Sequence, residues 1–490
     1  MQQMHIKEKP NKTVIAQFGE GNFLRAFCDH MIDLANEKGV FSGGVAVIKP
    51  ISFGNLDTLG EQHLQYTVIL RGLLEGEKVV DHRLVSSITE AIDPFIDYAA
   101  YENLAKNPDL RFVISNTTEA GIVFEASDDF SQKPANTFPG KLTQFLYTRY
   151  THFSGDNSKG LIVFPCELIE QNGTKLQECI AQYTKLWNLP EAFAVWVKET
   201  CIFCNTLVDR IVSGYPAEEA SQLEENLLGY QDKLMVVGEP FAFWAIESEH
   251  FAQVQKKFPL DSIGLPVVFC DNLKPYRDRK VRLLNGAHTT SVLASFLTGL
   301  DTVGEMMADE ACQSFLKHVV FKEIAPVVAL PAEEVADFAK SVLERFENPF
   351  IRHELLSISL NSVSKWKARV LPSFQDSFQK NGSLPKGLSF SLAALLAFYR
   401  SSKEENGTLV GSREGGTYPI RDDAHVLEAF AKNSDKTNLA FAQAILENVS
   451  FWGEDLTKME GLLPLITTYL DQIETLGMKQ ALKTILEEVA

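Results

Sequence analysis

The hydrophobic pattern of the chain changes near residue 275, and this change constrains the fold more than any other feature. Before that point, short apolar runs alternate with longer amphipathic stretches; after it, helical periodicity takes over. Strand and helix in regular alternation are typical of a doubly wound α/β domain. We therefore predict a Rossmann-like α/β domain over residues 1–275 and an all-helical domain over residues 276–490.

Several of the predicted strands are continuous apolar runs. Such runs are typical of strands that are buried on both faces of a parallel sheet. The predicted strands cover residues 13–18, 45–49, 110–115, 161–165, 234–238 and 266–270. The stretch 22–37 is long enough for a crossover helix, whereas residues 63–82 have the pattern of a hairpin outside the main sheet.

The second half contains two clear helical patterns and one predicted loop. Residues 332–346 repeat apolar side chains at three and four positions, which predicts an amphipathic helix. Residues 388–400 are apolar most of the way round, which predicts a central helix. The Gly-rich segment 405–421 is expected to be a mobile loop.

The chain is acidic, with 64 Asp and Glu, 46 Lys and Arg, and a net charge of −18. Nucleic-acid backbones and anionic membranes bind cationic surfaces, so neither partner is expected. There is no apolar run of about 18 residues to span a membrane and no secretory signal. Seven scattered cysteines fit a reducing compartment, so we expect a cytoplasmic protein.

Metal-dependent chemistry has little support in the sequence. Cys201 and Cys204 form a C-x-x-C, but they lie in an apolar stretch without a second pair or a nearby histidine. Two buried thiols are the default interpretation, with a zinc or redox site as the alternative. The ten histidines are dispersed, so we expect no metal.

A candidate nucleotide-binding turn follows the first predicted strand, at Gly19-x-Gly21. Two glycines let the backbone approach a pyrophosphate, and the following helix offers free N–H groups and the positive end of its dipole. Leu24 replaces the third glycine of the usual fingerprint, so a plain strand–helix turn is the alternative. The second strand ends in Lys49 rather than an acid, which leaves NAD or NADP open.

A polar segment, residues 115–121, follows another predicted buried strand. Ligands bind at the carboxyl ends of strands in open α/β sheets, so Asn116 is a candidate ligand-binding residue. The alternative is that Asn116 caps a helix.

The strongest chemical signal is the set Lys280, Asn285 and His288. At about 100° per residue, Asn285 lies about 140° and His288 about 80° around from Lys280, along roughly 12 Å of helix axis. A lysine can protonate a forming alkoxide when burial lowers its pKa, and an amide can donate to the developing oxyanion. Gly286 within the helix suggests a close approach by another segment. A basic, solvated helix face is the alternative.

Two basic clusters stand out against the acidic composition. Local positive charge on an acidic protein suggests a small anionic ligand, although a solvated helix face is the commoner explanation for either cluster alone. The first cluster is Lys274, Arg277, Arg279, Lys280 and Arg282, and the second is Lys365, Lys367 and Arg369.

With these residues, the sequence resembles the polyol-specific long-chain dehydrogenases, the mannitol dehydrogenase family. Lys280-x4-Asn285-x2-His288 matches the family's catalytic helix, and residues 203–211 match a motif that carries a catalytic asparagine, here Asn205. Residues 18–27 match the nucleotide turn, which implies cofactor contacts from Phe18, Gly19, Gly21, Asn22 and Phe23. Four further segments resemble the branch that interconverts tagaturonate and altronate: residues 113–122, 165–170, 239–247 and 360–367.

The resemblance implies a metal-independent, NAD-dependent enzyme of hexuronate catabolism whose partner is a small sugar acid. Lys280 is then the acid–base residue, Asn205 and Asn285 hold the carbonyl oxygen, and His288 binds a neighbouring hydroxyl. We expect the substrate carboxylate to meet Lys365 or, failing that, Lys367 or Arg369.

Three alternatives stay open at this point. A fructuronate reductase and a mannitol 2-dehydrogenase-like enzyme belong to the same class, and a non-catalytic sugar-acid sensor belongs to another. The mannitol-oxidising members have an aspartate where this chain has Ser248, so their substrate contacts from that segment do not carry over.

Overall fold

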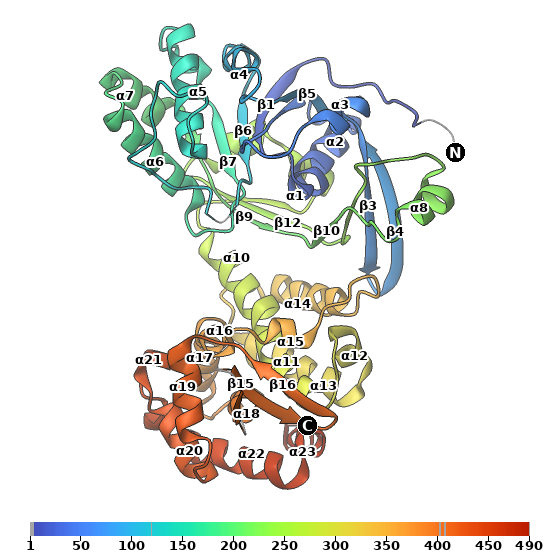
Figure 1. Ribbon diagram of the computed structural model, residues 1–490, viewed down its shortest axis with the longest axis vertical. Coiled ribbons are helices and arrows are strands. Elements are labelled where there is room, and N and C mark those ends of the chain that lie inside the picture. The colour runs from blue at the N-terminus through green and yellow to red at the C-terminus, as the bar shows by residue number, and fades with distance from the viewer. Residues whose placement is uncertain (1–3, 119, 401–402, 406–407, 490) are drawn as a thin grey trace. The chain divides into compact units, whose positions relative to one another are not determined.

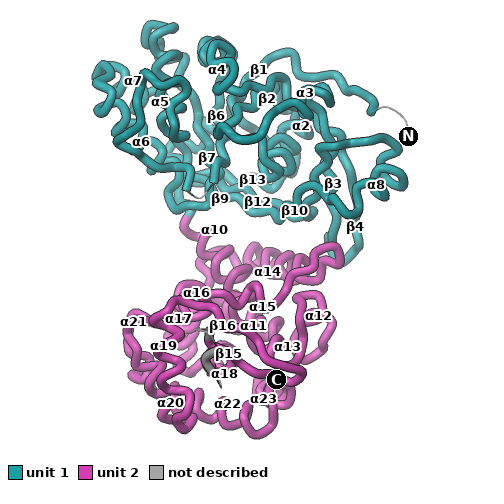
Figure 2. The backbone as a smooth tube through the Cα atoms, viewed as in Figure 1, with its two compact units in different colours: residues 1–273 teal, residues 274–490 magenta. Residues whose placement is uncertain are grey.

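The computed structural model describes residues 4–118, 120–400, 403–405 and 408–489. These residues form two compact units, 1–273 and 274–490 (Figure 2). Glu119, in the middle of the polar segment 115–121, lies outside the described residues.

Unit 1 is built around a six-stranded sheet in the order β5-β2-β1-β6-β7-β8, with every neighbouring pair parallel (Figure 1). Most of its strands are fully buried, which explains their continuous apolar sequences. The prediction of a Rossmann-like doubly wound domain is confirmed. The strands are β1 Thr13–Phe18, β2 Gly44–Ile48, β5 Ile88–Ile92, β6 Phe112–Ser115, β7 Ile162–Pro165 and β8 Ile202–Phe203.

Two hydrophobic clusters cover the two faces of this sheet. Phe27 and Met31 lie in one cluster with Trp244 and Phe258, and Tyr101 lies in the other with residues of the helices α5, α6 and α7. The helices of unit 1 are α1 Asn22–Leu24, η1 Arg25–Asp29, α2 His30–Glu37, α3 Asp57–Glu61, α4 Tyr98–Ala105, α5 Phe138–His152, η2 Asn157–Lys159, α6 Asn172–Leu186, α7 Glu191–Thr200, α8 Ala220–Leu223, η3 Glu224–Leu228, α9 Phe251–Lys257 and η4 Leu260–Ile263.

Two smaller sheets complete unit 1. The hairpin β3 Tyr66–Leu74 and β4 Glu77–Val85 lies outside the main sheet, as predicted, in the order β10-β11-β3-β4. The other sheet has the order β13-β12-β9. The predicted strands at 234–238 and 266–270 form, but as β11 and β13 they join these smaller sheets. The remaining bounds are β9 Asn205–Asp209, β10 Val212–Gly214, β11 Val236–Gly238, β12 Phe243–Glu247 and β13 Val267–Cys270.

Unit 2 is mostly helical, as predicted. The amphipathic helix α14 spans Ala332–Phe346, and the central helix α18 spans Lys386–Tyr399 and is buried along almost its whole length. The other helices are α10 Lys274–Arg279, η5 Lys280–Asn285, α11 Gly286–Leu297, α12 Val303–Ala308, α13 Glu310–His318, η6 Val319–Ile324, η7 Ala325–Val327, α15 Leu355–Ile358, α16 Ser362–Arg369, α17 Leu371–Asn381, α19 Ala424–Asn433, α20 Asn438–Leu446, α21 Val449–Trp452, η8 Leu456–Lys458, α22 Leu462–Leu476 and α23 Met478–Val489. Among the described helices, none is long and apolar enough to cross a membrane.

The prediction that residues 405–421 form a mobile loop is wrong for the described part of this segment. Unit 2 is therefore not entirely helical. This segment contributes to a small antiparallel sheet of β14 Lys403–Glu405, β15 Thr408–Arg413 and β16 Gly416–Ile420. Residues 406 and 407 lie outside the described residues. The sheet is anchored because Tyr418 is buried and its ring stacks on Phe398. The glycines of this segment supply the turn, since Gly415 and Gly416 have positive φ.

Candidate active site

The candidate nucleotide turn has the backbone features of a phosphate-binding turn. Gly19 has φ +128°, donates its N–H to Ile48 O at 3.0 Å, and lies so close to the main chain that a Cβ would be 3.0 Å from Asn116 O. Gly21 precedes the helix that begins at Asn22, and no side chain caps this helix. A Cβ on Gly21 would meet no atom within 4 Å, so the space beside the helix N-terminus is open.

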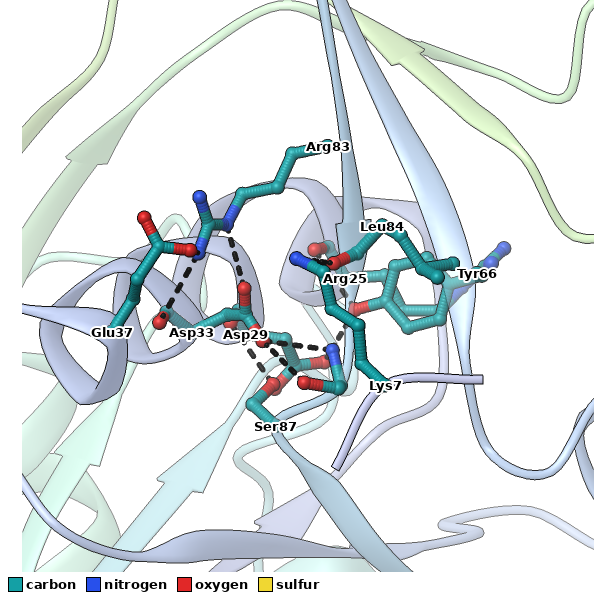
Figure 3. Close-up of polar contacts among 10 residues, drawn as sticks. Lys7, Arg25, Asp29, Asp33, Glu37, Tyr66, Arg83, Leu84 and Ser87 are labelled. Atoms are coloured by element: carbon teal, nitrogen blue, oxygen red, sulfur yellow. Dashed lines mark hydrogen bonds and ion pairs between the residues drawn. The ribbon is translucent and has the colours of Figure 1, made fainter. Parts of the chain in front are cut away.

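A buried polar network holds the helix that follows the turn (Figure 3). Tyr66 donates to Arg25 O at 3.0 Å and to Asp29 Oδ2 at 3.3 Å. Gln17 Nε2 lies 3.2 Å from Asp29 Oδ2 and 3.1 Å from Gly19 O, which connects the helix to the turn. Burial raises the pKa of Asp29 to about 7, although the bonds from Gln17 and Tyr66 oppose this shift.

The other residues predicted to contact the cofactor present different groups at the turn. The Phe18 side chain is buried in the core against Tyr101, so only its backbone faces the turn. Phe23 is half-buried and stacks on Phe27 at 5.0 Å. Asn22 Oδ1 accepts a hydrogen bond from Arg25 at 2.6 Å, which fixes its amide at the start of the helix.

In the sequence, Lys49 left the choice between NAD and NADP open. In the structure, this lysine already forms an ion pair. Its Nζ lies 2.7 Å from Asp93 Oδ2, and the two side chains are 3% and 11% exposed. Asp93 follows β5, the strand beside β2, so the acid comes from the neighbouring strand. The cation is therefore neutralised within the protein.

The polar segment after β6 is organised by Glu167 rather than by a helix. Glu167 is buried and accepts from Ser115 Oγ, Thr117 N and Thr117 Oγ1, each at 3.0 Å. Burial raises the pKa of this carboxyl, and the hydrogen bonds oppose the rise. Asn116 donates to Cys166 O at 2.9 Å and does not cap a helix, because the next described helix begins at Phe138.

Asn205 is the first residue of β9, and its side-chain amide is hydrogen-bonded on both sides. Its Nδ2 donates to Glu247 Oε1 at 2.7 Å, and its Oδ1 accepts from Thr174 N at 3.0 Å and Thr174 Oγ1 at 3.3 Å. Because a backbone N–H can only donate, the bond from Thr174 N determines which side of the amide is oxygen.

Lys280 and Asn285 lie on a π-helical turn between α10 and α11, not on a regular α-helix. The predicted 140° between them is therefore wrong. Hydrogen bonds from i to i+5 widen the turn, which brings residues five apart closer together around the axis than in a regular α-helix. Lys280 begins this π turn, Asn285 ends it, and His288 follows in α11.

Gly286 has the close neighbour that the sequence suggested. A Cβ at this position would lie 3.3 Å from the backbone oxygen of Arg369, at the end of α16. The missing side chain lets the helix that carries Lys280 contact the helix that carries the second basic cluster.

His288 lies in a positive environment. Its ring stacks on Phe346 at 3.9 Å and lies 5.4 Å from His353. Burial keeps the pKa of His288 well below its usual range, and charges from His353, Arg345, Arg369 and Lys365 lower it further. Among the described residues, its buried Nε2 has no hydrogen-bond partner. His288 is therefore a neutral imidazole surrounded by cations.

The structure separates the three residues of the second basic cluster. Lys365 and Arg369 are four apart on α16 and both act on His288. Lys365 Nζ also donates to Ile358 O at 2.9 Å. Lys367 lies on another side of α16, where its Nζ would be 3.5 Å from a Cβ on Gly453.

The first basic cluster is largely neutralised by carboxylates. Lys274 pairs with Asp278, Arg279 with Glu334 at 2.6 Å, and Arg282 with Asp376 at 2.5 Å. At least three of its five cations therefore have acidic partners.

Cys201 and Cys204 are both buried free thiols. Burial raises the pKa of Cys201 to about 11 and that of Cys204 to about 12. Within the described ranges, no group of three or more His, Cys, Asp or Glu side chains could hold a metal ion.

Two family models match consecutive parts of the chain. The mannitol dehydrogenase Rossmann domain matches residues 13–260, and the mannitol dehydrogenase C-terminal domain matches residues 272–474. The chain belongs to the mannitol dehydrogenase family. This membership confirms the resemblance drawn from the motifs.

Curated relatives in the mannitol dehydrogenase family cover almost the whole chain. Altronate oxidoreductase of Escherichia coli O7:K1 (strain IAI39 / ExPEC) is 44% identical over 478 residues, which are 96% of each chain. Altronate oxidoreductase of Yersinia enterocolitica serotype O:8 / biotype 1B is 42% identical over 491 residues, 98% of this chain and 99% of the relative. The chain is an oxidoreductase of this family.

Two solved structures share the fold of this mannitol dehydrogenase family member. Pseudomonas fluorescens mannitol 2-dehydrogenase, in a ternary complex with NAD and D-mannitol, is 20% identical with a TM-score of 0.63, covering 97% of this chain and 94% of that one. A D-sorbitol dehydrogenase in substrate-free form is 21% identical with a TM-score of 0.76, covering 97% of both. At these identities the likeness shows the fold alone.

Sequence reasoning missed several polar residues of the candidate site. Glu167 and Glu247 lie in segments 165–170 and 239–247, which the family resemblance had marked without assigning their carboxylates a role. Asp93 follows β5, a strand that was not predicted because Thr89 and Glu90 interrupt its apolar run.

Proposed function

We propose that this family member is an NAD-dependent reductase that interconverts tagaturonate and altronate in hexuronate catabolism. The observation that carries the proposal is the close packing of α16, which carries Lys365 and Arg369, against the helix of Lys280, Asn285 and His288, where a Cβ on Gly286 would lie 3.3 Å from Arg369 O. A site for a sugar acid needs a cation for the carboxylate beside groups for the reacting carbonyl. The curated names of the relatives at 42–44% identity support the choice of altronate.

The proposed reduction uses a lysine and two amides. A dinucleotide held at the turn of Gly19 and Gly21 and at the start of the Asn22 helix would supply the hydride for the carbonyl carbon. Lys280 gives the proton to the oxygen as it becomes an alkoxide, and returns to the protonated form from solvent. Asn285 and Asn205 donate hydrogen bonds to that oxygen and stabilise its developing charge. His288 presents Nε2 to a neighbouring hydroxyl. Because these groups supply the polarisation, no step requires a metal.

The residues around the nucleotide turn fit a dinucleotide, and they fit NAD better than NADP. The uncapped helix at Asn22 and the open space beside Gly21 suit a pyrophosphate. A 2′-phosphate needs an available cation, whereas Lys49 is buried in its pair with Asp93. A cytoplasmic location is also part of the proposal, supported by seven free cysteines.

A substrate and cofactor panel tests the proposal. The full chain is mixed with tagaturonate, fructuronate or fructose, each with NADH or NADPH, and NADH consumption is followed at 340 nm. We expect tagaturonate with NADH to have the highest kcat/KM, unchanged by EDTA. Preference for fructuronate or fructose would contradict the substrate, equal efficiency with NADPH would contradict the cofactor, and binding without turnover would favour a sensor.

A further inference from the structure

Glu247 joins two segments that meet at the end of unit 1. It is the last residue of β12 and lies opposite Asn205 of β9 in the antiparallel register. Its Oε1 accepts from Asn205 Nδ2 at 2.7 Å, and its Oε2 accepts from Leu273 N at 2.6 Å. Hydrogen bonds to an ionised acceptor are short and about twice as strong as neutral ones. One carboxylate therefore connects the Asn205 side chain to the backbone at the last residue of the unit.

The contacts around Asn205 hold its amide in one orientation. Thr174 donates to Oδ1 from its backbone and its hydroxyl, while Glu247 accepts from Nδ2 on the opposite side. An amide nitrogen carries two N–H groups, and Glu247 takes one of them. The second can then donate to a substrate oxygen, in a direction determined by the first.

We infer that Glu247 is a positioning residue that orients the Asn205 amide toward the substrate oxygen. This inference rests on the proposed function, in which Asn205 polarises the carbonyl. Glu247 itself does not contact the substrate. Glu247 restricts the Asn205 amide N–H to the direction in which it can donate to the substrate oxygen. An amide that is free to rotate stabilises the oxyanion less.

Glutamine at position 247 separates this role from simple packing. It has the size of glutamate but only one terminal oxygen, so it cannot accept from both Asn205 Nδ2 and Leu273 N. Glu249, two residues later and exposed, is the matched control because its change to glutamine removes the same charge without these contacts.

A double-mutant cycle measures the coupling between the two side chains. We expect Glu247→Gln to lower kcat for tagaturonate about 10- to 100-fold and Asn205→Ala about 100- to 1000-fold, with the NADH Kd within twofold of wild type. The double variant should be no slower than Asn205→Ala, because Glu247 acts through that amide. Glu249→Gln should keep wild-type kcat. Independent, multiplying effects of the two substitutions, or wild-type kcat in Glu247→Gln, would overturn the inference.

Crystal structures of wild type and Glu247→Gln provide a readout that does not depend on the substrate. A turned Asn205 amide in the variant supports the inference; an unchanged amide overturns it. If the wild type reduces no uronate, the proposed function fails on its own, and the structures still decide whether Glu247 orients Asn205.

Discussion

At the scale of single residues, the relative positions of Lys280 and Asn285 depend on the π turn that carries them. Its i→i+5 spacing brings the ammonium and the amide closer together around the axis than a regular α-helix would, which suits the roles proposed for both on one oxygen. The neutral His288 adds a polar nitrogen, since burial and, after it, nearby cations keep its pKa well below the usual range.

Lys280→Ala should lower kcat about 10²- to 10⁴-fold, because the variant has no positioned proton donor. The NADH Kd, measured by fluorescence titration, should stay within twofold of wild type. A small external amine should restore part of the rate. Lys274→Ala is the control, since that lysine is exposed and pairs with Asp278. Wild-type turnover in Lys280→Ala would remove this residue from the mechanism.

Lys365→Ala and Arg369→Ala should weaken uronate reduction selectively. A lost charge partner for the carboxylate should cost about 2–4 kcal/mol in kcat/KM for tagaturonate, while residual fructose reduction barely changes. Lys367→Ala should resemble wild type, because this side chain lies near Gly453 and away from His288. Steady-state kinetics on both substrates is the measurement. Proportional losses on the two substrates would show that the cluster is structural.

Asp29→Asn should change how stability depends on pH. The folded pKa of Asp29 is raised to about 7, so between pH 4 and 7 the folded state holds a proton that the unfolded state has lost. This carboxyl therefore makes wild-type stability fall as pH rises through that window, by up to roughly 1.4 kcal/mol per pH unit.

Urea unfolding at pH 5, 6, 7 and 8 measures the effect. Asparagine has no such titration, so the variant should gain about 2 kcal/mol relative to wild type between pH 5 and pH 7. A constant difference between the two proteins across this range would mean that Asp29 is ionised in the folded state at all four pH values.

At the scale of elements, the start of α6 determines where Asn205 lies. Gly173 is in the first turn of α6, and a Cβ there would come within 2.2 Å of Cys204 O and 3.0 Å of Asn205 N. The helix therefore packs directly on the backbone that leads into β9. No side chain fits between them without moving the helix or the strand.

Gly173→Ala should destabilise the protein by about 1–3 kcal/mol and lower kcat, because the overlap involves backbone atoms. Gly60→Ala is a matched control: Gly60 also lies in a helix, and a Cβ there would meet no atom within 4 Å. That control should be neutral or slightly stabilising. Thermal unfolding of both variants provides the comparison, and equal melting temperatures would disprove the close packing at Gly173.

At the scale of the whole molecule, the candidate residues are divided between two units. Unit 1, teal in Figure 2, carries the candidate nucleotide turn with Gly19 and the residue proposed to polarise the carbonyl, Asn205, on sheets with their own hydrophobic clusters. Unit 2 carries Lys280, His288 and the cations of α16. A compact unit with its own core can often fold alone, so the binding and the proton-transfer functions should be separable.

Residues 1–273 alone should bind NADH with a Kd within a few-fold of the full chain and reduce no tagaturonate. Fluorescence titration measures the binding, and circular dichroism checks that the fragment is folded. A folded fragment without NADH affinity would contradict the assignment of the nucleotide site to unit 1.

Local sequence was enough to predict the fold class, a Rossmann-like domain followed by a mostly helical one, and several of its elements. The strands at 13–18 and 161–165 were recognisable as continuous apolar runs, which strands buried on both faces require. The helix at 332–346 was recognisable because its apolar residues repeat with the helical period. The set Lys280, Asn285 and His288 was recognisable as well, since its members are close in sequence.

The polar pairs of the candidate site depended on the fold. Lys49 and Asp93 are 44 residues apart, and Asn205 and Glu247 are 42 apart. Such pairs form only when parallel and antiparallel strands bring distant residues into register, which no local period encodes. The π turn at Lys280 and the separation of Lys367 from Lys365 likewise arise from packing between helices, because tertiary contacts, not intrinsic preference, choose among helical geometries that differ little in energy.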